Sequence, residues 1–458
     1  MATSVVQALV ERDQVLRSLT TALRRWPGHL CVLFAVGWWL WPWSGLTVAA
    51  AAIAAATLRY WSSRHASTWS HLQGPVAGRL WRWQIKRRWS EICSRCGLAS
   101  AGIPLVRRTR VAWPYLHLLV RPALGQTAAD FEAATEAVRV GVGASRLRVE
   151  PHGIRDVLLT LTIGDELRAP FDARPAAVAE SLDYVRMGRR EDGEPWLLAV
   201  GPHTLVAGCS GSGKGSLFWS FAFGLAPPVR EGRVQLHGVD LKGGMEILMG
   251  EGLFSSCATN AAEAVQVLEM LVTWMRKRAQ EYAGHLRSHS PSVEEPLHVV
   301  MIDELAALTA YCPERDLQRR AETAINLLCS QGRAPGFMVF ACLQDPRKEV
   351  IPSRGLFTQM VGLRLKDLSE TSMVLGEVAV RSGAHCHRIT RDVPGTGYVL
   401  PEEGGHPIRV RAGFASDDAI REVARRFATP TRVPVIVPAP TDDPMTVRPR
   451  RPSSSAAA

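Results

Sequence analysis

Short apolar runs alternate with longer helical patterns over residues 186–428. Two helical patterns are long, one capped by Asn260 and running to about Tyr282, the other spanning Glu314–Ser330. Strands that alternate with helices pair in parallel beneath those helices, so this region predicts one α/β domain with a parallel sheet. The predicted strands are Leu197–Val200, Thr204–Ala207, Val234–Val239, His298–Ile302, Met338–Leu343, Val361–Leu365 and Gly397–Leu400.

The first 61 residues follow a different pattern. Residues 1–25 place apolar side chains on one helical face and predict a cytoplasmic amphipathic helix. Residues 27–58 contain no Asp, Glu, Lys or Arg, and Pro42, Ser44 and Gly45 interrupt this run near its middle. Because the run is too long for one comfortable span, it predicts a two-span transmembrane helical hairpin over 26–61. Arginines on both flanks put both ends in the cytoplasm, so the expected location is the cell membrane.

Two other interpretations of the apolar run stay open. The small residues of 48–56 would suit the cleavage site of a signal sequence. A buried hairpin in a soluble domain is the second alternative.

The middle of the chain divides into two parts. Residues 62–112 form a basic connector in which cations alternate with large aromatics, as in Arg79–Trp89. This stretch suits either anionic lipid headgroups or a solvated helix whose tryptophans pack on the next domain. Residues 113–185 predict a small α+β subdomain, with strands at 115–121, 146–150 and 157–163 and a helix at 127–140. Residues 429–458 are rich in Pro, Thr, Asp, Arg and Ser and predict a disordered tail.

Charge and cysteine content narrow the class of protein. The formal net charge is +11 over 458 residues, which favours an anionic partner such as nucleic acid or anionic lipid. Nine cysteines scattered over a long chain argue against a disulfide framework and for a reducing compartment. Cys93 and Cys96 form a C-x-x-C without a second pair at a useful spacing, so we expect no structural zinc there.

The strongest motif is a phosphate-binding loop after the predicted strand Thr204–Ala207. Glycines at these positions let successive backbone N–H groups point at an anion, and the following helix directs its positive end there. Lys214 would reach the β- and γ-phosphates. The residue after this lysine is usually Ser or Thr and binds Mg²⁺, but here it is Gly215, and we expect Ser216 to replace it. The predicted nucleotide-binding residues are Gly208, Cys209, Ser210, Gly211, Ser212, Gly213, Lys214, Gly215 and Ser216.

Two adjacent acids, Asp303 and Glu304, follow the predicted strand His298–Ile302. In nucleotide hydrolases the first such acid holds Mg²⁺ and the second orients or deprotonates the attacking water. Gln344 follows another predicted strand and is placed to sense the γ-phosphate. A solvated turn is the alternative for the two acids.

The order of these motifs resembles the FtsK/SpoIIIE family of DNA-translocating ATPases. The resemblance covers about residues 113–428 and rests on five segments: Thr204–Ser216, Asp240–Glu246, Gly332–Pro346, Pro394–Pro401 and Ile408–Asp418. It implies a RecA-like P-loop NTPase motor that binds ATP and Mg²⁺ and forms a homo-hexamer around double-stranded DNA. It also suggests Arg333 as an arginine finger acting on a neighbouring subunit, with Arg354 and Arg391 as alternatives.

The chain departs from the family pattern at Gly215, in its two short spans, in lacking a long linker, and in leaving no room for a winged helix after Phe427. This compact layout is similar to actinobacterial conjugative translocases of the TraB kind. We therefore expect a membrane-anchored DNA pump for conjugative transfer, helped by an accessory protein that recruits the DNA. The alternatives are a chromosome-segregation pump, a type IV coupling protein for single strands, a protein-secretion ATPase of the same superfamily, and a membrane assembly factor that does not hydrolyse ATP.

Overall fold

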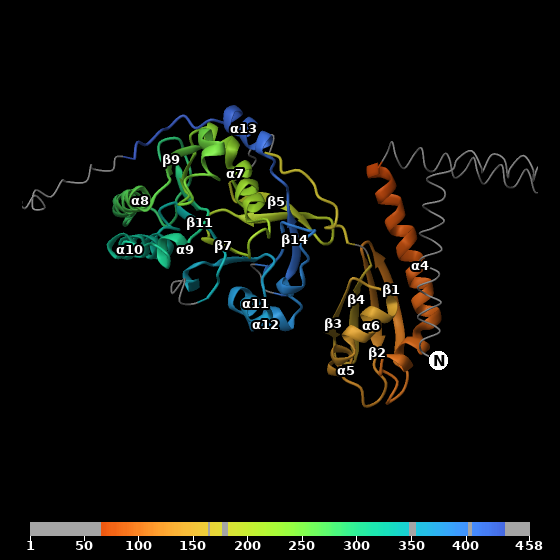
Figure 1. The fold of residues 1–458 in the computed structure, drawn as a ribbon. Helices are drawn as coiled ribbons and strands as arrows, with labels where there is room; N and C mark the ends of the chain where they lie inside the picture. Colours follow the sequence, from red (N-terminus) through yellow and green to blue (C-terminus); the bar gives the residue numbers. More distant parts are fainter. Residues whose placement is uncertain (1–65, 164, 176–181, 348–353, 402–404, 436–458) are drawn as a thin grey trace, which may run out of the picture. The chain divides into compact units, whose positions relative to one another are not determined.

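A computed structural model describes residues 66–163, 165–175, 182–347, 354–401 and 405–435 (Figure 1). The predicted amphipathic helix and transmembrane hairpin lie outside these residues. Within the described residues, no helix combines the length and the apolarity that crossing a bilayer requires. Of the described residues, 66–89 together with Val111–Trp113 form one compact unit, and the others form a second.

Much of the basic connector is helical, in α4 (Ala66–Arg95). Leu80 and Trp83 are each 57% exposed, and the Arg87 guanidinium lies 5.3 Å from the centre of the Trp83 ring. The connector also contains a strand that the sequence pattern missed, β1 (Leu105–Ala112). Half of the β1 residues are exposed and none is buried, so the strand lacks the apolar alternation that would have indicated it.

The small α+β subdomain has the three predicted strands, with β1 as a fourth in the order β1-β2-β4-β3. Strand β4 pairs antiparallel with both β2 and β3. The predicted helix is present as two short helices that meet at Ala134. The remaining bounds are β2 (Tyr115–Arg121), α5 (Ala128–Ala133), α6 (Thr135–Val142), β3 (Arg146–His152) and β4 (Asp156–Thr162).

The α/β domain is built on a ten-stranded sheet in the order β6-β5-β14-β13-β12-β7-β11-β10-β8-β9. The six strands from β12 to β9 are parallel, and the four from β13 to β6 pair antiparallel. The prediction of a parallel sheet is therefore right for the half that carries the phosphate loop and wrong for the other half. The strands are β5 (Tyr184–Arg190), β6 (Pro195–Ala199), β7 (Thr204–Ala207), β8 (Val234–Val239), β9 (Phe254–Ala258), β10 (Leu297–Ile302), β11 (Phe337–Leu343), β12 (Gln359–Gly362), β13 (Thr396–Val399) and β14 (Ile408–Ala412).

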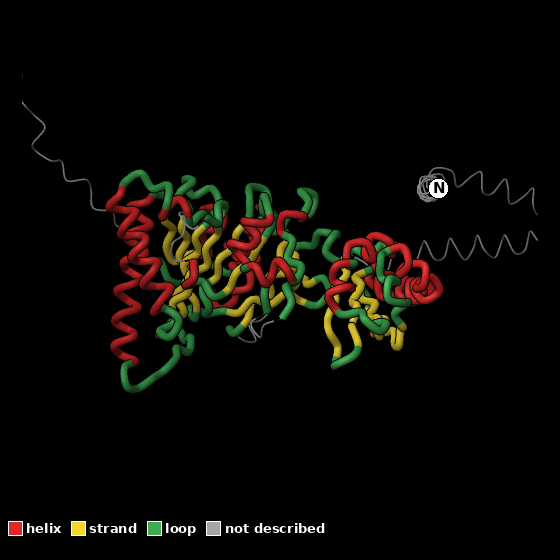
Figure 2. Tube along the Cα trace, turned by 90° about the horizontal axis from the view of Figure 1, so that it is seen from below, coloured by secondary structure: helices red, strands yellow, loops and turns green. Residues whose placement is uncertain are grey.

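Helices cover both faces of this sheet, and in Figure 2 strands lie between them. Helices α7 (Lys214–Arg230) and α13 (Asp417–Arg426) pack on one face, with Val206 of β7 in the shared core. The opposite face, with Leu205, packs against α8 (Ala261–Tyr282), α9 (Ala306–Thr309) and α10 (Arg315–Gln331). Because these parallel strands are buried on both faces, the predicted ones appear in the sequence as continuous apolar runs. The other elements are α11 (Leu368–Leu375), α12 (Glu377–Arg381) and the 3₁₀ turns η1 (Leu248–Leu253), η2 (Arg354–Leu356) and η3 (Cys386–Arg388).

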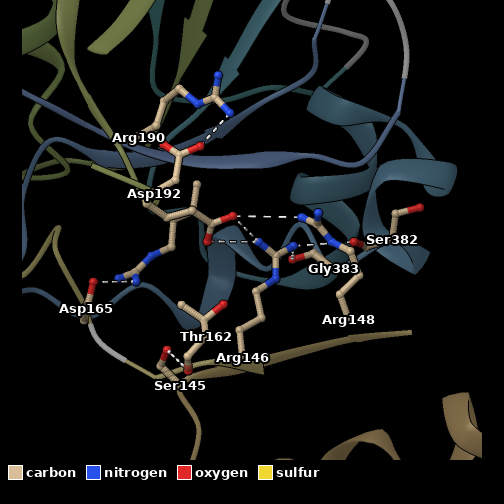
Figure 3. Close-up of polar contacts among 11 residues, drawn as sticks. Ser145, Arg146, Arg148, Thr162, Asp165, Arg190, Asp192, Ser382 and Gly383 are labelled. Carbon is tan, nitrogen blue, oxygen red and sulfur yellow. Dashed lines mark hydrogen bonds and ion pairs between the residues drawn. The ribbon is translucent and has the colours of Figure 1, made fainter. Parts of the chain in front are cut away.

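Polar contacts link β3 to the α/β domain (Figure 3). Arg146 Nη1 lies 3.1 Å from Glu191 Oε1, and Arg146 Nη2 donates to the Gly383 carbonyl at 3.2 Å. Arg409 Nη1 on β14 is 2.9 Å from Asp165 Oδ1. Residues 429–435 also contact the domain, because the Thr429 amide donates to the Gly252 carbonyl at 2.9 Å. The first residues of the predicted tail, 429–435, are therefore bound to the domain.

Candidate active site

The predicted phosphate loop joins β7 to α7, and the first three residues of α7 are Lys214, Gly215 and Ser216. Lys214 Nζ folds back over the loop and donates to the carbonyls of Gly208, at 2.8 Å, and Cys209, at 3.3 Å. Burial lowers the pKa of Lys214, although the nearby acids partly oppose this effect. A partly buried ammonium whose hydrogen bonds go to neutral carbonyls is suited to pairing with a phosphate.

The turn into α7 depends on Gly213, which caps the helix at φ +95°. A Cβ atom at this position would lie 2.1 Å from the Gly395 nitrogen. The Gly395 amide in turn donates to the Ser212 carbonyl at 2.8 Å, so the segment before β13 supports the loop. Ser212 Oγ is buried and, among the described residues, has no hydrogen-bond partner. The amino end of α7 and this hydroxyl together provide donors for an anion.

The two predicted acids stand directly after β10. The Asp303 side chain is 10% exposed, and its Oδ2 lies 2.6 Å from Lys242 Nζ. Glu304 Oε1 accepts from the backbone N–H of Gln344 at 3.2 Å. Glu304 Oε2 is buried without a partner among the described residues. Burial raises the pKa of Glu304, as required of a general base that takes a proton from water.

Sheet order brings these residues together. Strand β11 lies between β7 and β10, and all three strands are parallel. Their carboxyl ends therefore meet at one edge, where the loop, the acids and Gln344 each follow a strand. The structure places Lys214, Asp303, Glu304 and Gln344 at this edge, which is the arrangement expected of a nucleotide hydrolase.

Three charged residues at the site were missed as functional candidates: Lys242, Glu246 and Arg364. Lys242 and Glu246 follow β8, whose carboxyl end lies beside that of β10. Arg364 follows β12, and its Nη2 donates to the Ser210 carbonyl of the loop at 2.8 Å. The motif Asp240–Glu246 was a usable signal for the first two, while Arg364 has no local sequence signal.

Arg333 lies away from these residues in its own chain. It is exposed and precedes β11, at the amino ends of the parallel strands. Its charge helps to lower the pKa of His203, which precedes β7, although burial of His203 is the larger cause. Because Lys214 is at the carboxyl edge, Arg333 lies at the opposite end of the parallel strands from the phosphate loop of its own chain.

Residues 167–290 match the sequence profile of the FtsK/SpoIIIE family. Transfer protein TraSA of Streptomyces ambofaciens is 28% identical over 65% of this chain and 75% of its own length. A sporulation regulatory protein of Streptomyces azureus is 30% identical over 61% of this chain and 95% of its own length. DNA translocase FtsK of Listeria monocytogenes is 23% identical, and the match spans 42% of that protein.

Among solved structures, the conjugation coupling protein TcpA, in its monomer form with ATPgS, is similar with a TM-score of 0.49 and 18% identity over 75% of this chain and 99% of that chain. The family assignment rests on the sequence matches, which include nearly the whole length of the Streptomyces azureus relative. The chain therefore belongs to the FtsK/SpoIIIE family, and it is an ATPase.

Proposed function

We propose that this protein is a membrane-anchored, ATP-driven translocase of double-stranded DNA that serves the conjugative transfer of a plasmid or integrative element. One observation carries the proposal: Lys214, Asp303, Glu304 and Gln344 converge at the carboxyl edge of β7, β10 and β11. The relatives named as a transfer protein and as DNA translocases support DNA as the substrate. The net charge of +11 supports a polyanionic partner.

Each site residue has a role in hydrolysis. Lys214 and the amides of the loop hold the β- and γ-phosphates. Glu304 accepts the proton of the attacking water, for which its unpartnered, buried Oε2 is suited. Gln344, whose backbone N–H donates to Glu304 Oε1, reports whether the γ-phosphate is present.

Magnesium would be held at the same edge. Among the described residues, no group of three or more His, Cys, Asp or Glu side chains forms a metal site by itself. A complete protein cage is not expected, because Mg²⁺ in nucleotide sites takes one or two carboxylates, phosphate oxygens and several waters. The Asp303 carboxylate fits this requirement. The sequence-based candidate for a second protein ligand was the Ser216 hydroxyl of α7, which lies one residue after the usual position. Bound Mg²⁺ would neutralise charge on the phosphates.

The proposed assembly is a homo-hexamer with DNA in its channel. Arg333 would then reach the nucleotide of a neighbouring subunit, in keeping with its place at the sheet edge opposite Lys214. Arg354 and Arg391 remain alternatives for this role. The hairpin at 26–61 would anchor the ring in the cell membrane, so that hydrolysis moves the DNA and not the protein.

The test is the ATPase rate of the full chain in detergent or nanodiscs, measured with duplex DNA, with single-stranded DNA and without DNA. We expect duplex DNA to stimulate hydrolysis most and Lys214→Ala to abolish the stimulation. No stimulation by duplex DNA at any low salt concentration would contradict DNA translocation. Preferential stimulation by single strands would favour a coupling protein, and stimulation by a candidate protein substrate a secretion motor. Wild-type hydrolysis no faster than that of Lys214→Ala would favour an assembly factor.

A further inference from the structure

Gly215 lies where the loop of most related ATPases would place a metal-binding hydroxyl, and a carboxylate fills the adjoining space. A Cβ atom built on Gly215 would lie 2.9 Å from Glu246 Oε1 and 3.5 Å from Glu246 Cδ and Oε2. The direction that a side chain at position 215 would take therefore ends on this carboxylate. Helix α7 still begins at Lys214, so the loop has not shifted by one residue to present Ser216.

Several contacts hold Glu246 in this position. Its amide donates to Asp240 Oδ2 at 2.8 Å, and its Oε1 accepts from Trp219 Nε1 at 2.7 Å. Asp240 is 1% exposed and its other oxygen accepts from the Lys242 amide at 2.9 Å, so the turn after β8 is itself fixed. Among the described residues, no hydrogen bond is made to Glu246 Oε2, which stays available as a ligand.

The surrounding charge favours a cation beside Glu246. Four acids gather at this edge, namely Asp240, Glu246, Asp303 and Glu304, against the two lysines Lys214 and Lys242 and the loop-bound Arg364. Asp240 accepts from the Glu246 backbone amide, and the Lys242 ammonium of the same turn lies 2.6 Å from Asp303, so these carboxyl groups share one edge of the site. A divalent cation would offset this excess of negative charge.

We propose that Glu246 replaces the missing loop hydroxyl as an oxygen donor to the Mg²⁺ bound with ATP, and that Gly215 leaves room for this carboxylate, which a side chain at position 215 would displace. The inference rests on the proposed nucleotide site and assigns the metal ligand within it. Carboxylate oxygens are preferred ligands of Mg²⁺, so the exchange of a hydroxyl for a carboxylate is chemically sound. On this proposal, Gly215 and Glu246 together replace the usual metal-binding hydroxyl, and Gly215 does not mark a nucleotide site that has lost its function.

The proposal can be tested by substituting Gly215 and Glu246, singly and together, in the full chain. The probe is a fluorescent ADP analogue, whose binding is titrated in EDTA and at increasing Mg²⁺ concentrations. We expect Glu246→Ala to raise the half-saturating Mg²⁺ concentration by about tenfold or more, with metal-free nucleotide binding unchanged. Gly215→Ser alone should also weaken Mg²⁺ binding, because its Cβ meets the carboxylate. The double variant Gly215→Ser/Glu246→Ala should recover much of the loss, since it restores the usual hydroxyl and removes the obstacle.

Two further variants separate metal binding from packing. Glu246→Gln keeps an acceptor for Trp219 but removes the charge, so it should weaken Mg²⁺ binding without altering the far-ultraviolet circular dichroism or the melting temperature. Ser216→Ala should leave the Mg²⁺ dependence as in the wild type. The proposal is overturned if Glu246→Ala and Glu246→Gln keep the wild-type Mg²⁺ dependence, if Ser216→Ala alone abolishes it, or if the double variant is no better than either single one. A wild-type protein that binds no nucleotide at all would instead contradict the proposed function.

Discussion

Glu304 is the residue on which hydrolysis should depend most strongly. Replacing its carboxylate by the amide of Glu304→Gln keeps the size and the hydrogen bond from the Gln344 amide but removes the base. We expect the hydrolysis rate to fall by about two to four orders of magnitude, with ATP binding retained. Steady-state ATPase assays and nucleotide-binding titrations of the same preparation check this. A variant that retains a large share of the wild-type rate would show that Glu304 is not the base.

The pH dependence of Glu304 follows from its burial. The base must be ionised, and burial raises its pKa, so the wild-type rate should begin to fall, on acidification, at a higher pH than an exposed glutamate would allow. The effect of pH on stability runs the other way from its effect on the hydrolysis rate. Since the folded state favours the protonated acid, the wild type should lose stability relative to Glu304→Gln as the pH rises through this raised pKa. Melting temperatures at pH 5 and pH 8 test the second point.

The candidate catalytic residues that the sequence predicted are those with a local signal. The glycine loop and the acid pair each occupy a few consecutive residues next to an apolar strand. Lys242, Glu246 and Arg364 reach the same site only because β8 and β12 take particular places in the sheet. Gly215 shows this limit most clearly: in the sequence it is a departure from a motif, and only its distance from Glu246 gives it a physical reason.

Two neighbouring strands carry a buried histidine pair that should make the protein sensitive to acid. His237 Nε2 on β8 lies 3.2 Å from His298 Nδ1 on β10, and His237 Nδ1 lies 2.8 Å from Ser256 Oγ. Burial lowers the pKa of His237 from 6.5 to about 3, and burial likewise lowers that of His298 well below 6.5. Both rings are therefore neutral in the folded protein. Below pH 6.5 the unfolded chain binds protons that the folded chain does not. The free energy of unfolding therefore decreases as the pH is lowered from 6.5 to the pKa of the folded state.

Each histidine should contribute at most about 1.4 kcal/mol of lost unfolding free energy per pH unit within this window. Urea denaturation at pH 7 and pH 5.5 measures the slope. His237→Gln, which keeps a partner for Ser256, should reduce it, whereas His285→Gln at an exposed position should not. Equal slopes for wild type and His237→Gln would contradict the assignment of a neutral buried ring.

Helices and strands could be predicted where burial leaves an apolar pattern in the sequence or where a capping residue marks the start of a helix. Helix α8 was expected from Asn260 to Tyr282, and the Asn260 side chain does accept from the Glu263 amide. Five of the six parallel strands were found because both of their faces are buried. The sixth, β9, was missed because Ser255 and Ser256 interrupt its apolar run. Strands β1, β5 and β14 were missed, since they carry arginines at several positions and follow no continuous apolar run. The antiparallel half of the sheet follows from long-range pairings such as β14 with β5, which no local pattern encodes.

At the scale of the whole molecule, the excess of Lys and Arg over Asp and Glu predicts that the protein binds DNA through its phosphates. The chain has 54 Lys and Arg against 43 Asp and Glu, although many of the described arginines are paired with acids, as Arg409 is with Asp165. Cations that remain unpaired would bind phosphates, which carry no sequence information. Each phosphate contact releases counterions, so the logarithm of the binding constant should fall with the logarithm of salt concentration by about 0.9 per contact.

We therefore expect duplexes of unrelated sequence to bind the full chain with similar affinity and with the same steep salt dependence. Fluorescence anisotropy of labelled duplexes over a range of NaCl concentrations measures both quantities. Lys214→Ala is the matched control, because it removes a cation from the nucleotide site and should leave the salt slope unchanged. Binding that is insensitive to salt, or that discriminates strongly between sequences, would mean that base contacts and not phosphate contacts hold the DNA. Since the motor would have to advance along any sequence it meets, such a result would also count against translocation by this chain alone.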